Sequence, residues 1–349
     1  MQFNILNLTN VSKYQCIYCK CYYIMKNNAT QTSVIDIRNY DNLYYIDSDA
    51  SEELWNKCKE NGLHYLQFTH KFNSARTNSH FWKYLDLEAA LLCLRNGNIR
   101  FVEPTRWEDK YEGRFYNADY SNVCQDSNEY PFLYACCMSH KSHNEAAWKV
   151  YSYGKTGLGA HCVQFKINRS RLRLELVKNA KSLKFIVEGN VLYYKESIIN
   201  DLHKKETIKK SEKRLNPNYS NFFDYFNFGK YINLLLLKRD YFQHENETRI
   251  FLIPKQAPQE KSKESGGQLG RHEDIPINWG NIIEEVRIDS KCTSLEYDLL
   301  KEACYNLLPK FDAENGTDED LRNWKKLKDR LTPIKTDIYG VRKNIKIEG

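Results

Sequence analysis

Apolar residues recur at helical spacing within residues 86–97, DLEAALLCLRNG, and short apolar stretches lie on either side. Asp86 is a typical N-cap residue and Gly97 a typical helix end, so the segment predicts a short amphipathic helix. Residues 81–84 and 99–102 predict strands, and Pro104 stops the second one. The pattern therefore predicts a strand, a helix and a strand in succession.

Similar patterns predict further elements downstream. Strands are expected over residues 133–138, 160–167, 184–187, 191–194 and 282–288. Helices are expected over residues 144–153, 197–214, 221–239 and 294–308, with one more exposed helix beyond residue 316. In the strand 160–167, His161 shares a face with three apolar residues, which favours a core histidine over a ligand.

Residues 245–253 predict a strand with unusual charges. Alternate residues of a strand point to the same side, so one face is expected to carry Glu245, Glu247, Arg249 and Phe251. Two carboxylates and a guanidinium lose hydration on such a face unless they pair with each other or meet a ligand. The alternative is an edge strand whose charged face is exposed to water.

Strands and helices alternate irregularly along the chain, and no internal repeat of the solenoid kind is visible. This order predicts an α+β fold with a central mixed β-sheet and flanking helices, rather than a regular doubly wound sheet. Residues 63–312 are expected to form a single main domain. Residues 1–62 are expected to form an N-terminal appendage, and residues 313–349 a charged helical tail.

Composition and charge narrow the class of protein. Of the 349 residues, 41% are hydrophobic and 13% aromatic, so a packed core is expected and global disorder is not. The formal net charge of +7 is too small for a dedicated nucleic-acid binder. Much of the positive charge lies in residues 203–214, HKKETIKKSEKR, which favours a solvated helix face. A nucleic-acid contact through the same residues is the alternative.

Cysteine usage indicates a reducing compartment. The 11 cysteines are scattered and odd in number, which argues against a secreted disulfide framework. Cys16, Cys19 and Cys21 offer three thiols in CIYCKC, but no fourth ligand follows at finger spacing, so no metal is predicted. The N-terminal residues do not resemble a signal peptide, and no apolar run approaches the roughly 20 residues of a membrane span. We therefore expect a cytoplasmic protein without a membrane partner.

The candidate chemistry lies in three segments of the chain. The loop TRWEDKYEGRF, residues 105–115, places Trp107, Asp109 and Glu112 directly after a strand, where functional residues concentrate. A surface loop packed under its own aromatic residues is the alternative. The other two segments are residues 139–151 and 245–249. GKTG, residues 154–157, lacks the first glycine of a P-loop and follows a helix, which excludes a nucleotide site of the Walker type.

Three stretches, taken in order, resemble the bacterial domain-of-unknown-function family 2971. They are WKYLDLEAALLCLRNGNIRFVEPTRWEDKYEGRF, YACCMSHKSHNEAAWKVYS and KRDYFQHENETRIFLI, and the resemblance covers about residues 81–290. The polar signature of the family falls on Lys83, Tyr84, Arg100, Pro104, Asp109, Glu112, Ser139, Trp148, Tyr151, Glu245, Glu247 and Arg249. The chain departs from the family pattern at Trp107, where a smaller aromatic is usual, and at Glu108, where Asn is common.

The order of these parts is also similar to that of mono-ADP-ribosyltransferases, which implies an NAD-consuming transferase or NAD glycohydrolase in stress or phage defence. In such enzymes a carboxylate stabilises the positive charge that develops at the anomeric carbon. The resemblance places Glu247 in that role, Glu245 at the acceptor and Ser139 at the ribose or against Glu247. It assigns the NAD co-substrate to Lys83 or Arg100 at the pyrophosphate, Trp148 or Tyr151 at the nicotinamide, and Tyr84 and Arg249 nearby.

Two alternatives from other classes stay open. In the first, Asp109 and Glu112 hold Mg²⁺ or a partner, and residues 203–214 contact nucleic acid, in a nuclease-like or non-enzymatic defence role. In the second, the chain is a ligand-binding or protein-interaction module. Trp148 and Tyr151 are then core residues, and the charged residues form a buried network that maintains the fold.

Overall fold

The computed structural model describes residues 43–45, 52–68, 79–107, 109, 111–112, 133–142, 144–152, 161–200, 232, 235–255, 272–310 and 316–336. Cys16, Cys19, Cys21, residues 154–157 and residues 203–214 lie outside these ranges, and so does Glu108. The predictions made for them are therefore not addressed by the structure.

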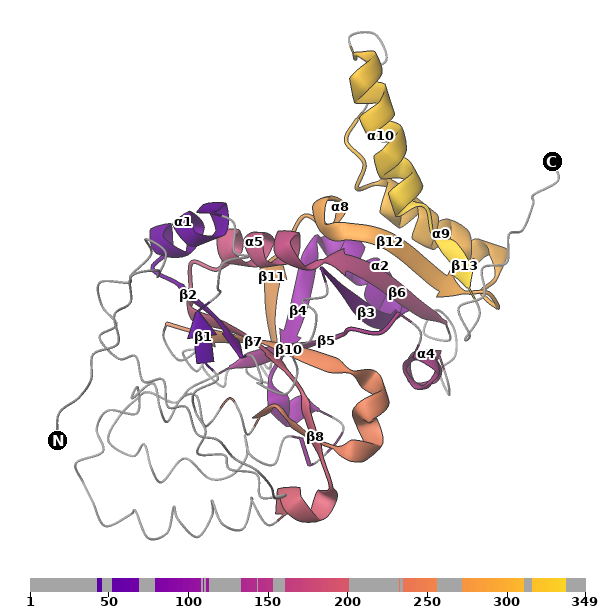
Figure 1. Ribbon diagram of the computed structural model, residues 1–349. Coiled ribbons are helices and arrows are strands. Elements are labelled where there is room, and N and C mark those ends of the chain that lie inside the picture. Colours follow the sequence, from indigo (N-terminus) through magenta and orange to yellow (C-terminus); the bar gives the residue numbers. More distant parts are fainter. Residues whose placement is uncertain are drawn as a thin grey trace, which may run out of the picture.

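A large mixed β-sheet forms the centre of the described chain (Figure 1). Its 11 strands follow the order β1-β2-β7-β10-β5-β3-β6-β12-β13, and β4, which carries β11, pairs with β5. The bounds are β1 Leu43–Tyr45, β2 His64–Phe68, β3 His80–Asp86, β4 Asn98–Val102, β5 Tyr134–Ser139, β6 Cys162–Asn168, β7 Leu183–Asn190, β10 Glu247–Pro254, β11 His272–Pro276, β12 Ile283–Asp289 and β13 Ile334–Thr336. A separate parallel pair joins β8, Leu192–Tyr194, to β9, Leu237–Arg239.

Both strand directions occur in the sheet. The β2–β7 and β12–β13 pairs are parallel, whereas β10 is antiparallel to both of its neighbours, β5 and β7. Helices lie beside the sheet rather than alternating regularly with its strands. The α+β prediction with a central mixed sheet is therefore confirmed.

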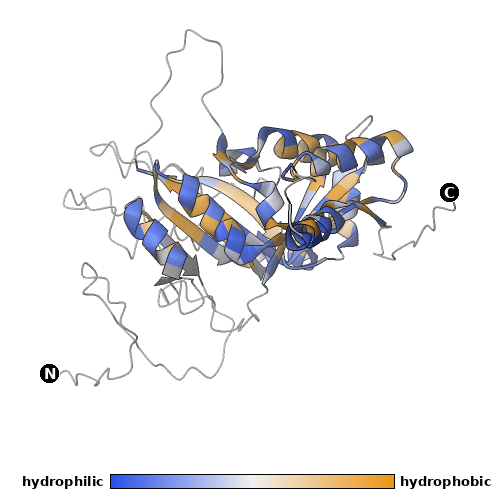
Figure 2. Cartoon of the chain, turned by 90° about the horizontal axis from the view of Figure 1, so that it is seen from above, coloured by the Kyte–Doolittle hydropathy of each residue, from blue (hydrophilic) through white to orange (hydrophobic). Residues whose placement is uncertain are grey.

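Most helices cover one face of the sheet, which we call the main-core face (Figures 1 and 2). They are α1 Glu52–Glu60, α2 Leu87–Asn96, α5 Arg169–Asn179, α8 Trp279–Ile282, α9 Ser294–Tyr305 and α10 Asp318–Leu331. Their apolar residues join those of the strands in one large cluster. Figure 2 shows the same helices with hydrophilic outer faces.

Two smaller clusters lie on the opposite face, which we call the site face. One packs Phe251 of β10 with residues near β9, and the other packs Trp82 and Tyr84 of β3 under α4, Glu145–Ser152. Trp82 pairs with Ser139, and Ser139 pairs with Glu247, so these strands carry the site face across the sheet.

Local capping signals in the sequence are realised in the structure. The Asp86 carboxylate accepts a hydrogen bond from the Ala89 amide at 2.7 Å, and Gly97 ends α2 in the left-handed region at φ 61°. Asn144 accepts a hydrogen bond from the Ala147 amide at 3.1 Å at the start of α4. These predictions are confirmed because caps depend on residues close in sequence.

Three sequence predictions about strands and helices were wrong. The strand predicted from residue 245 begins at Glu247, because residues 240–245 form a 3₁₀ helix, η4, and Asn246 turns the chain at φ 44°. The helix predicted to residue 239 stops earlier, since Leu237–Arg239 is strand β9. The edge-strand alternative for β10 is excluded because β10 lies between β5 and β7.

Parts of the predicted appendage and tail belong to the sheet. Strand β1 pairs with β2, and α1 places Leu54 and Cys58 in the main core. At the other end, α10 begins at Asp318 and is followed by β13, which pairs with β12. Within the described ranges, no helix combines the length and the apolar character that crossing a bilayer requires.

Candidate functional site

The three segments singled out in the sequence meet on the site face, at one end of β10. Glu112 of the loop contacts Arg249 of β10, and the Ser139 hydroxyl donates a hydrogen bond to the Glu245 carbonyl at 2.6 Å. The Asn144 side chain, at the start of α4, donates to the His244 carbonyl at 3.3 Å. The structure therefore brings these three segments into contact.

Arg249 is the fully buried centre of this group. Its Nε donates to Glu247 at 2.8 Å, its Nη1 donates to the Leu235 carbonyl at 2.6 Å, and its Nη2 contacts Glu112. The Trp107 ring covers the guanidinium, with 4.2 Å between its centroid and the Arg249 Cζ. A guanidinium with this many partners is available to a cofactor only if part of the network opens.

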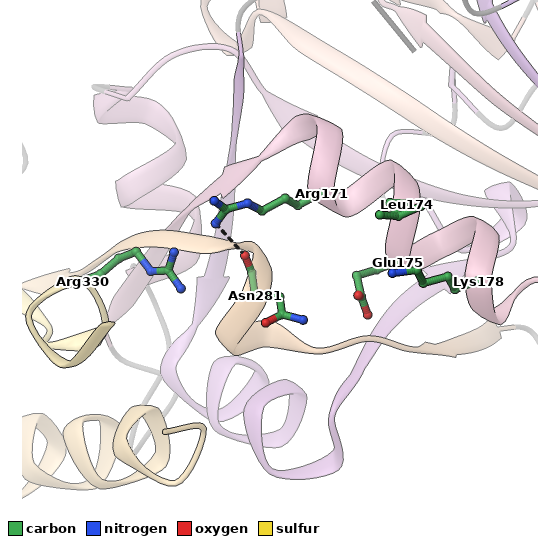
Figure 3. Close-up of a pocket in the computed structure, with 6 residues that line it drawn as sticks. All are labelled: Arg171, Leu174, Glu175, Lys178, Asn281 and Arg330. Carbon is green, nitrogen blue, oxygen red and sulfur yellow. Dashed lines mark hydrogen bonds between the residues drawn. The ribbon is translucent and has the colours of Figure 1, made fainter. Parts of the chain in front are cut away.

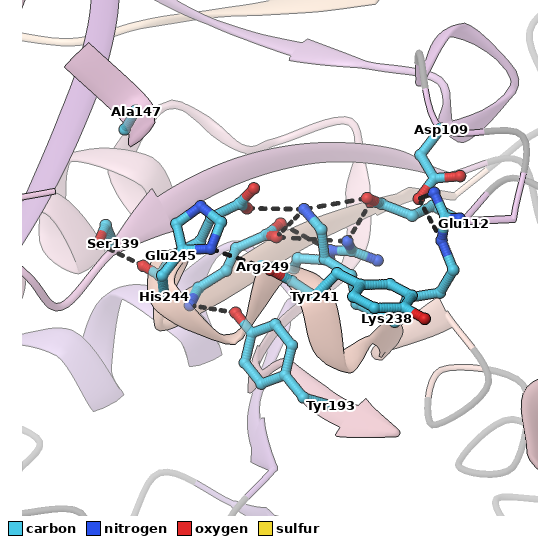
Figure 4. Close-up of polar contacts among 12 residues, drawn as sticks. Asp109, Glu112, Ser139, Ala147, Tyr193, Lys238, Tyr241, His244, Glu245 and Arg249 are labelled. Carbon is cyan, nitrogen blue, oxygen red and sulfur yellow. Dashed lines mark hydrogen bonds and ion pairs between the residues drawn. The ribbon is translucent and has the colours of Figure 1, made fainter. Parts of the chain in front are cut away.

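Lys238 of β9 connects the three carboxylates (Figure 4). Its Nζ lies 2.7 Å from Glu245, 2.9 Å from Glu247 and 3.0 Å from Glu112. We call these five residues the β10 cluster: Glu112, Lys238, Glu245, Glu247 and Arg249. Three carboxylates face two cations, so the cluster contains more acid than base.

The two glutamates of the Glu-x-Glu sequence differ in exposure and in pKa. The side chain of Glu247 is 4% exposed, and that of Glu245 is 29% exposed. Burial would raise the pKa of Glu247, but Arg249 and Lys238 outweigh it and lower that pKa to about 2. Burial raises the pKa of Glu245, the Glu247 charge raises it further, and Lys238 offsets only part of the effect. Environment thus pushes the two pKa values apart.

Glu245 reaches its place through a turn and not through the strand. It ends η4, Asp240–Glu245, and Asn246 then adopts left-handed backbone before β10 begins. Asparagine tolerates this conformation better than most residues. The Ser139 hydroxyl holds the Glu245 main chain and also accepts a hydrogen bond from the Lys141 amide at 3.0 Å. Ser139 therefore positions Glu245 in the structure.

The aromatic residues proposed for nicotinamide belong to α4 and pack against Tyr84 of β3. Trp148 is 1% exposed and makes an edge contact with Tyr84, which also stacks on Tyr151 at 6.5 Å between ring centroids. The Tyr84 hydroxyl donates to the Lys141 carbonyl at 3.0 Å. Burial raises the pKa of Tyr151 to about 12. Trp148 is therefore enclosed by protein, whereas Tyr151 is partly buried and has one ring face against Tyr84.

The two residues proposed for the pyrophosphate are not brought to the β10 cluster. Lys83 lies on the main-core face, where its Nζ donates to the Cys136 thiol at 3.2 Å. Arg100 of β4 forms a paired contact with Asp274 of β11, with both N–O distances at 2.8 Å. Neither side chain faces the glutamates of β10, so this part of the hypothesis has no geometric support.

Asp109 belongs to a neighbouring contact beside the β10 cluster. Its carboxylate accepts from Arg239 at 3.0 Å, and Arg239 also lies 3.4 Å from Glu196. The Tyr111 hydroxyl donates to Glu196 at 2.6 Å. Pro104 begins the short turn, Pro104–Arg106, that leads into this loop. The loop is thus held to β9 by ion pairs.

Sequence reasoning missed several residues of the site. Lys238 and Arg239 follow an apolar run that predicts only a helix, yet both face carboxylates. The Tyr193 hydroxyl accepts from the Glu247 amide at 2.9 Å, and Cys137 lies opposite Arg249 in the β10–β5 pairing. Two adjacent basic residues at the end of an apolar run were the one available signal.

A second ion cluster lies on the main-core face. Glu188 of β7 receives hydrogen bonds from Arg173 at 3.0 and 3.1 Å and from the Tyr65 hydroxyl at 3.2 Å, and it also contacts Arg169. We call Tyr65, Arg169, Arg173 and Glu188 the α5 cluster. Burial would raise the pKa of Glu188, but the two guanidinium groups lower it. Here two cations face one carboxylate.

Two further observations limit the chemistry of the described residues. Within the described ranges, no group of three or more His, Cys, Asp or Glu side chains is placed to hold a metal ion. His161, predicted to be a core residue, lies half-buried with its Nε2 3.4 Å from Glu296.

Glu245 is the most exposed acid of the β10 cluster and the member best placed to exchange a proton with a bound molecule.

Comparisons with known proteins identify no family for the chain. No family model matches the chain, and neither a curated protein nor a solved structure is detectably similar to it. The resemblance to the family 2971 and to mono-ADP-ribosyltransferases therefore stays a prediction.

Proposed function

We propose that the protein is a cytoplasmic enzyme that cleaves the bond between nicotinamide and ribose in NAD, with Glu245 as its proton acceptor. The observation that supports this proposal is the pair Glu245 and Glu247, whose pKa values move in opposite directions around one lysine. Pairs of carboxylates separated in this way are typical of sites that transfer protons. A role in stress or phage defence is part of the same proposal.

In the proposed reaction, the C1′–N1 bond breaks and its electron pair leaves with nicotinamide. Because the nicotinamide nitrogen is cationic in NAD, the leaving group needs no proton. Water or an acceptor hydroxyl then forms the new bond to C1′, and its proton passes to Glu245. Glu245 acts in its ionised form, so its raised pKa places the onset of activity at a higher pH than an ordinary glutamate would.

Glu247 has a positioning role in this proposal. Arg249 bonds one of its carboxylate oxygens at 2.8 Å and Lys238 bonds the other at 2.9 Å, so neither oxygen is open to a substrate. Its buried negative charge holds Lys238 in place, and Lys238 in turn holds Glu245. This arrangement differs from the role under the anomeric carbon that the family resemblance implies for Glu247.

Nicotinamide release from NAD by the purified full chain tests the proposal. We expect Glu245→Gln to lower kcat by about 10²-fold or more, as loss of a general base does, with little change in KM. The acid limb of the pH profile should disappear with it. Glu302→Gln, at an exposed site on α9, is the matched control and should retain full activity.

A positioning role predicts a different result for Glu247→Gln. Removing its charge should shift the acid limb of the pH profile to lower pH, because Glu247 helps to raise the pKa of Glu245. Absence of nicotinamide release by the wild-type protein, or equal release by Glu245→Gln, contradicts the proposal.

A second candidate is a binding module in which the β10 cluster maintains the fold. The observation that favours it is the paired state of the buried charges of Glu112, Lys238, Glu247 and Arg249, together with the core position of Trp148. It predicts no NAD turnover and a stable, folded Glu245→Gln variant. The nuclease alternative lacks such support, because Asp109 and Glu112 each face a guanidinium and not a common open point.

A further inference from the structure

A hollow of about 370 Å³ lies between α5, α8 and α10, on the opposite side of the sheet from the β10 cluster (Figure 3). The residues that line it are Arg171, Leu174, Glu175, Lys178, Asn281 and Arg330. Three of these side chains are basic and one is acidic. The hollow is therefore electropositive, and it falls within the size range of small-molecule sites.

The two arginines converge on neighbouring carbonyls of α8. The Arg171 Nη1 donates to the Asn281 carbonyl at 3.0 Å, and the Arg330 Nη2 donates to the Gly280 carbonyl. Figure 3 shows Arg171 reaching from α5 and Arg330 from α10 towards the same short helix. Neutral carbonyls orient these guanidinium groups, but they do not neutralise them.

No carboxylate of the described residues forms an ion pair with Arg171 or Arg330. The Glu284 charge raises the pKa of Arg330. The Glu284 carboxylate, however, accepts a hydrogen bond from the Asn168 side chain at 2.8 Å and pairs with His80. The Arg330 Nε is buried and has no hydrogen-bond partner among the residues that the structure describes. A buried donor without a partner costs free energy.

The acidic residue of the lining forms no ion pair with either arginine in the described part of the chain. The Glu175 carboxylate accepts a hydrogen bond from the Asn278 amide at 3.0 Å, and Lys178 lies 3.5 Å from Glu53. Burial lowers the pKa of Arg330, and the nearby Arg171 charge lowers it further. Arginine stays protonated all the same, so the two positive charges repel each other unless an anion separates them.

We propose that this hollow is an oxyanion site that binds a phosphate group through the guanidinium groups of Arg171 and Arg330. Arginine is well suited to phosphate because its planar donors match the spacing of the phosphate oxygens. A bound phosphate relieves the repulsion between the two arginines. The phosphate can be free or can belong to a small phosphorylated molecule, and the two sources share the same contacts.

Binding of inorganic phosphate to the full chain, by calorimetry at constant ionic strength, tests the site. Ionic strength is held with sodium chloride because general screening would otherwise mimic specific binding. We expect saturable binding by the wild type and a loss of about tenfold or more in affinity for both Arg171→Gln and Arg330→Gln, the cost of one charge-assisted hydrogen bond. Arg322→Gln, at an exposed site on α10, is the matched control and should bind like the wild type.

A second arm uses AMP in place of inorganic phosphate. Tighter binding of AMP that still depends on both arginines assigns the site to a phosphorylated small molecule, and equal binding assigns it to the free anion. Arg171 is exposed, so its variant is expected to fold even if Arg330→Gln does not. No saturable binding, or equal affinity in Arg171→Gln and the wild type, overturns the proposal. Glu245→Gln should bind phosphate normally, which separates this test from that of NAD cleavage.

Discussion

The α5 cluster and the β10 cluster occupy opposite faces of neighbouring strands, one residue apart in register. Glu188 pairs with Ile250, whose side chain belongs to the main core. The next residue along β10, Arg249, points to the opposite face of the sheet. Each cluster places a carboxylate between two basic side chains and lowers its pKa. The two clusters differ in the sign of their net charge.

The α5 cluster has one carboxylate for two guanidinium groups, and every charged member is buried. The β10 cluster has three carboxylates for two cations, and its surplus acid, Glu245, is the member that reaches water. A surplus charge that is partly hydrated can change protonation without breaking the core, whereas a fully enclosed charge cannot. The comparison teaches that buried ion pairs alone do not identify a functional site, and that the spare titratable group is what distinguishes the β10 cluster from the α5 cluster.

The largest effect is expected from removing the single acid of the α5 cluster. Glu188→Gln leaves the Arg169 and Arg173 charges buried without compensation, which should lower the free energy of unfolding by about 3–5 kcal/mol. Urea denaturation measures this loss, and Glu302→Gln serves as the exposed control. A loss below 1 kcal/mol would show that the cluster is not closed to water.

The next effect is the loss of stability in acid. The pKa of Glu247 falls from its ordinary 4.5 to about 2 on folding, a difference of about 3 kcal/mol in stability. Since a lowered pKa means that the unfolded chain binds the proton first, this stability is complete above pH 4.5 and disappears as the pH falls towards 2. Denaturation of Glu247→Gln across that range should show a shallower pH slope than the wild type, and an unchanged slope would contradict the ion-pair account.

A smaller effect is expected at the turn that separates Glu245 from β10. Asn246 has φ 44°, and its carbonyl accepts from the His140 amide at 3.0 Å. Asn246→Ala should cost about 1 kcal/mol, because a left-handed alanine is sterically unfavourable, while Asn246→Gly should be nearly neutral. The pair of variants distinguishes backbone conformation from loss of the side chain, and equal stabilities would argue against strain at this turn.

The smallest effect on stability at neutral pH is expected for Glu245→Gln, about 0.5 kcal/mol in either direction. The variant loses the contact with Lys238, but it also loses a charge that the folded state disfavours. Because the folded pKa of Glu245 is raised, the wild type loses stability as the pH rises through that pKa, and the variant should not. Unfolding free energies from pH 4 to 8 compare the two, and a falling limb that persists in the variant would assign it to another group.

How far the sequence predicts this molecule depends on whether the causes are local. Helix α2 and its ends were predicted correctly because Asp86 and Gly97 act on their own neighbours. Helix α5 was not predicted, because two of its buried residues are Arg169 and Arg173, whose partner Glu188 lies on another element. A pattern of apolar residues does not predict a helix whose buried face contains arginine.

The same distinction applies to the candidate site. The acidic strand and the loop were selected from their residue types, and Glu112, Glu245, Glu247 and Arg249 do come together. The sequence could not show that Lys83 faces the other side of the sheet, because the side depends on strand register. Lys238 was missed because β9 is formed by pairing with the distant β8.

The strands at the two ends of the main strand order are short, which limits how the sheet contacts other molecules in solution. Leu43–Tyr45 and Ile334–Thr336 are three residues each, so they offer few unpaired peptide groups to another molecule. A chain cut before Ile334 would instead end the sheet at Ile283–Asp289, a longer strand of seven residues. Such a truncation would expose a longer unpaired strand edge and promote intermolecular strand addition and aggregation.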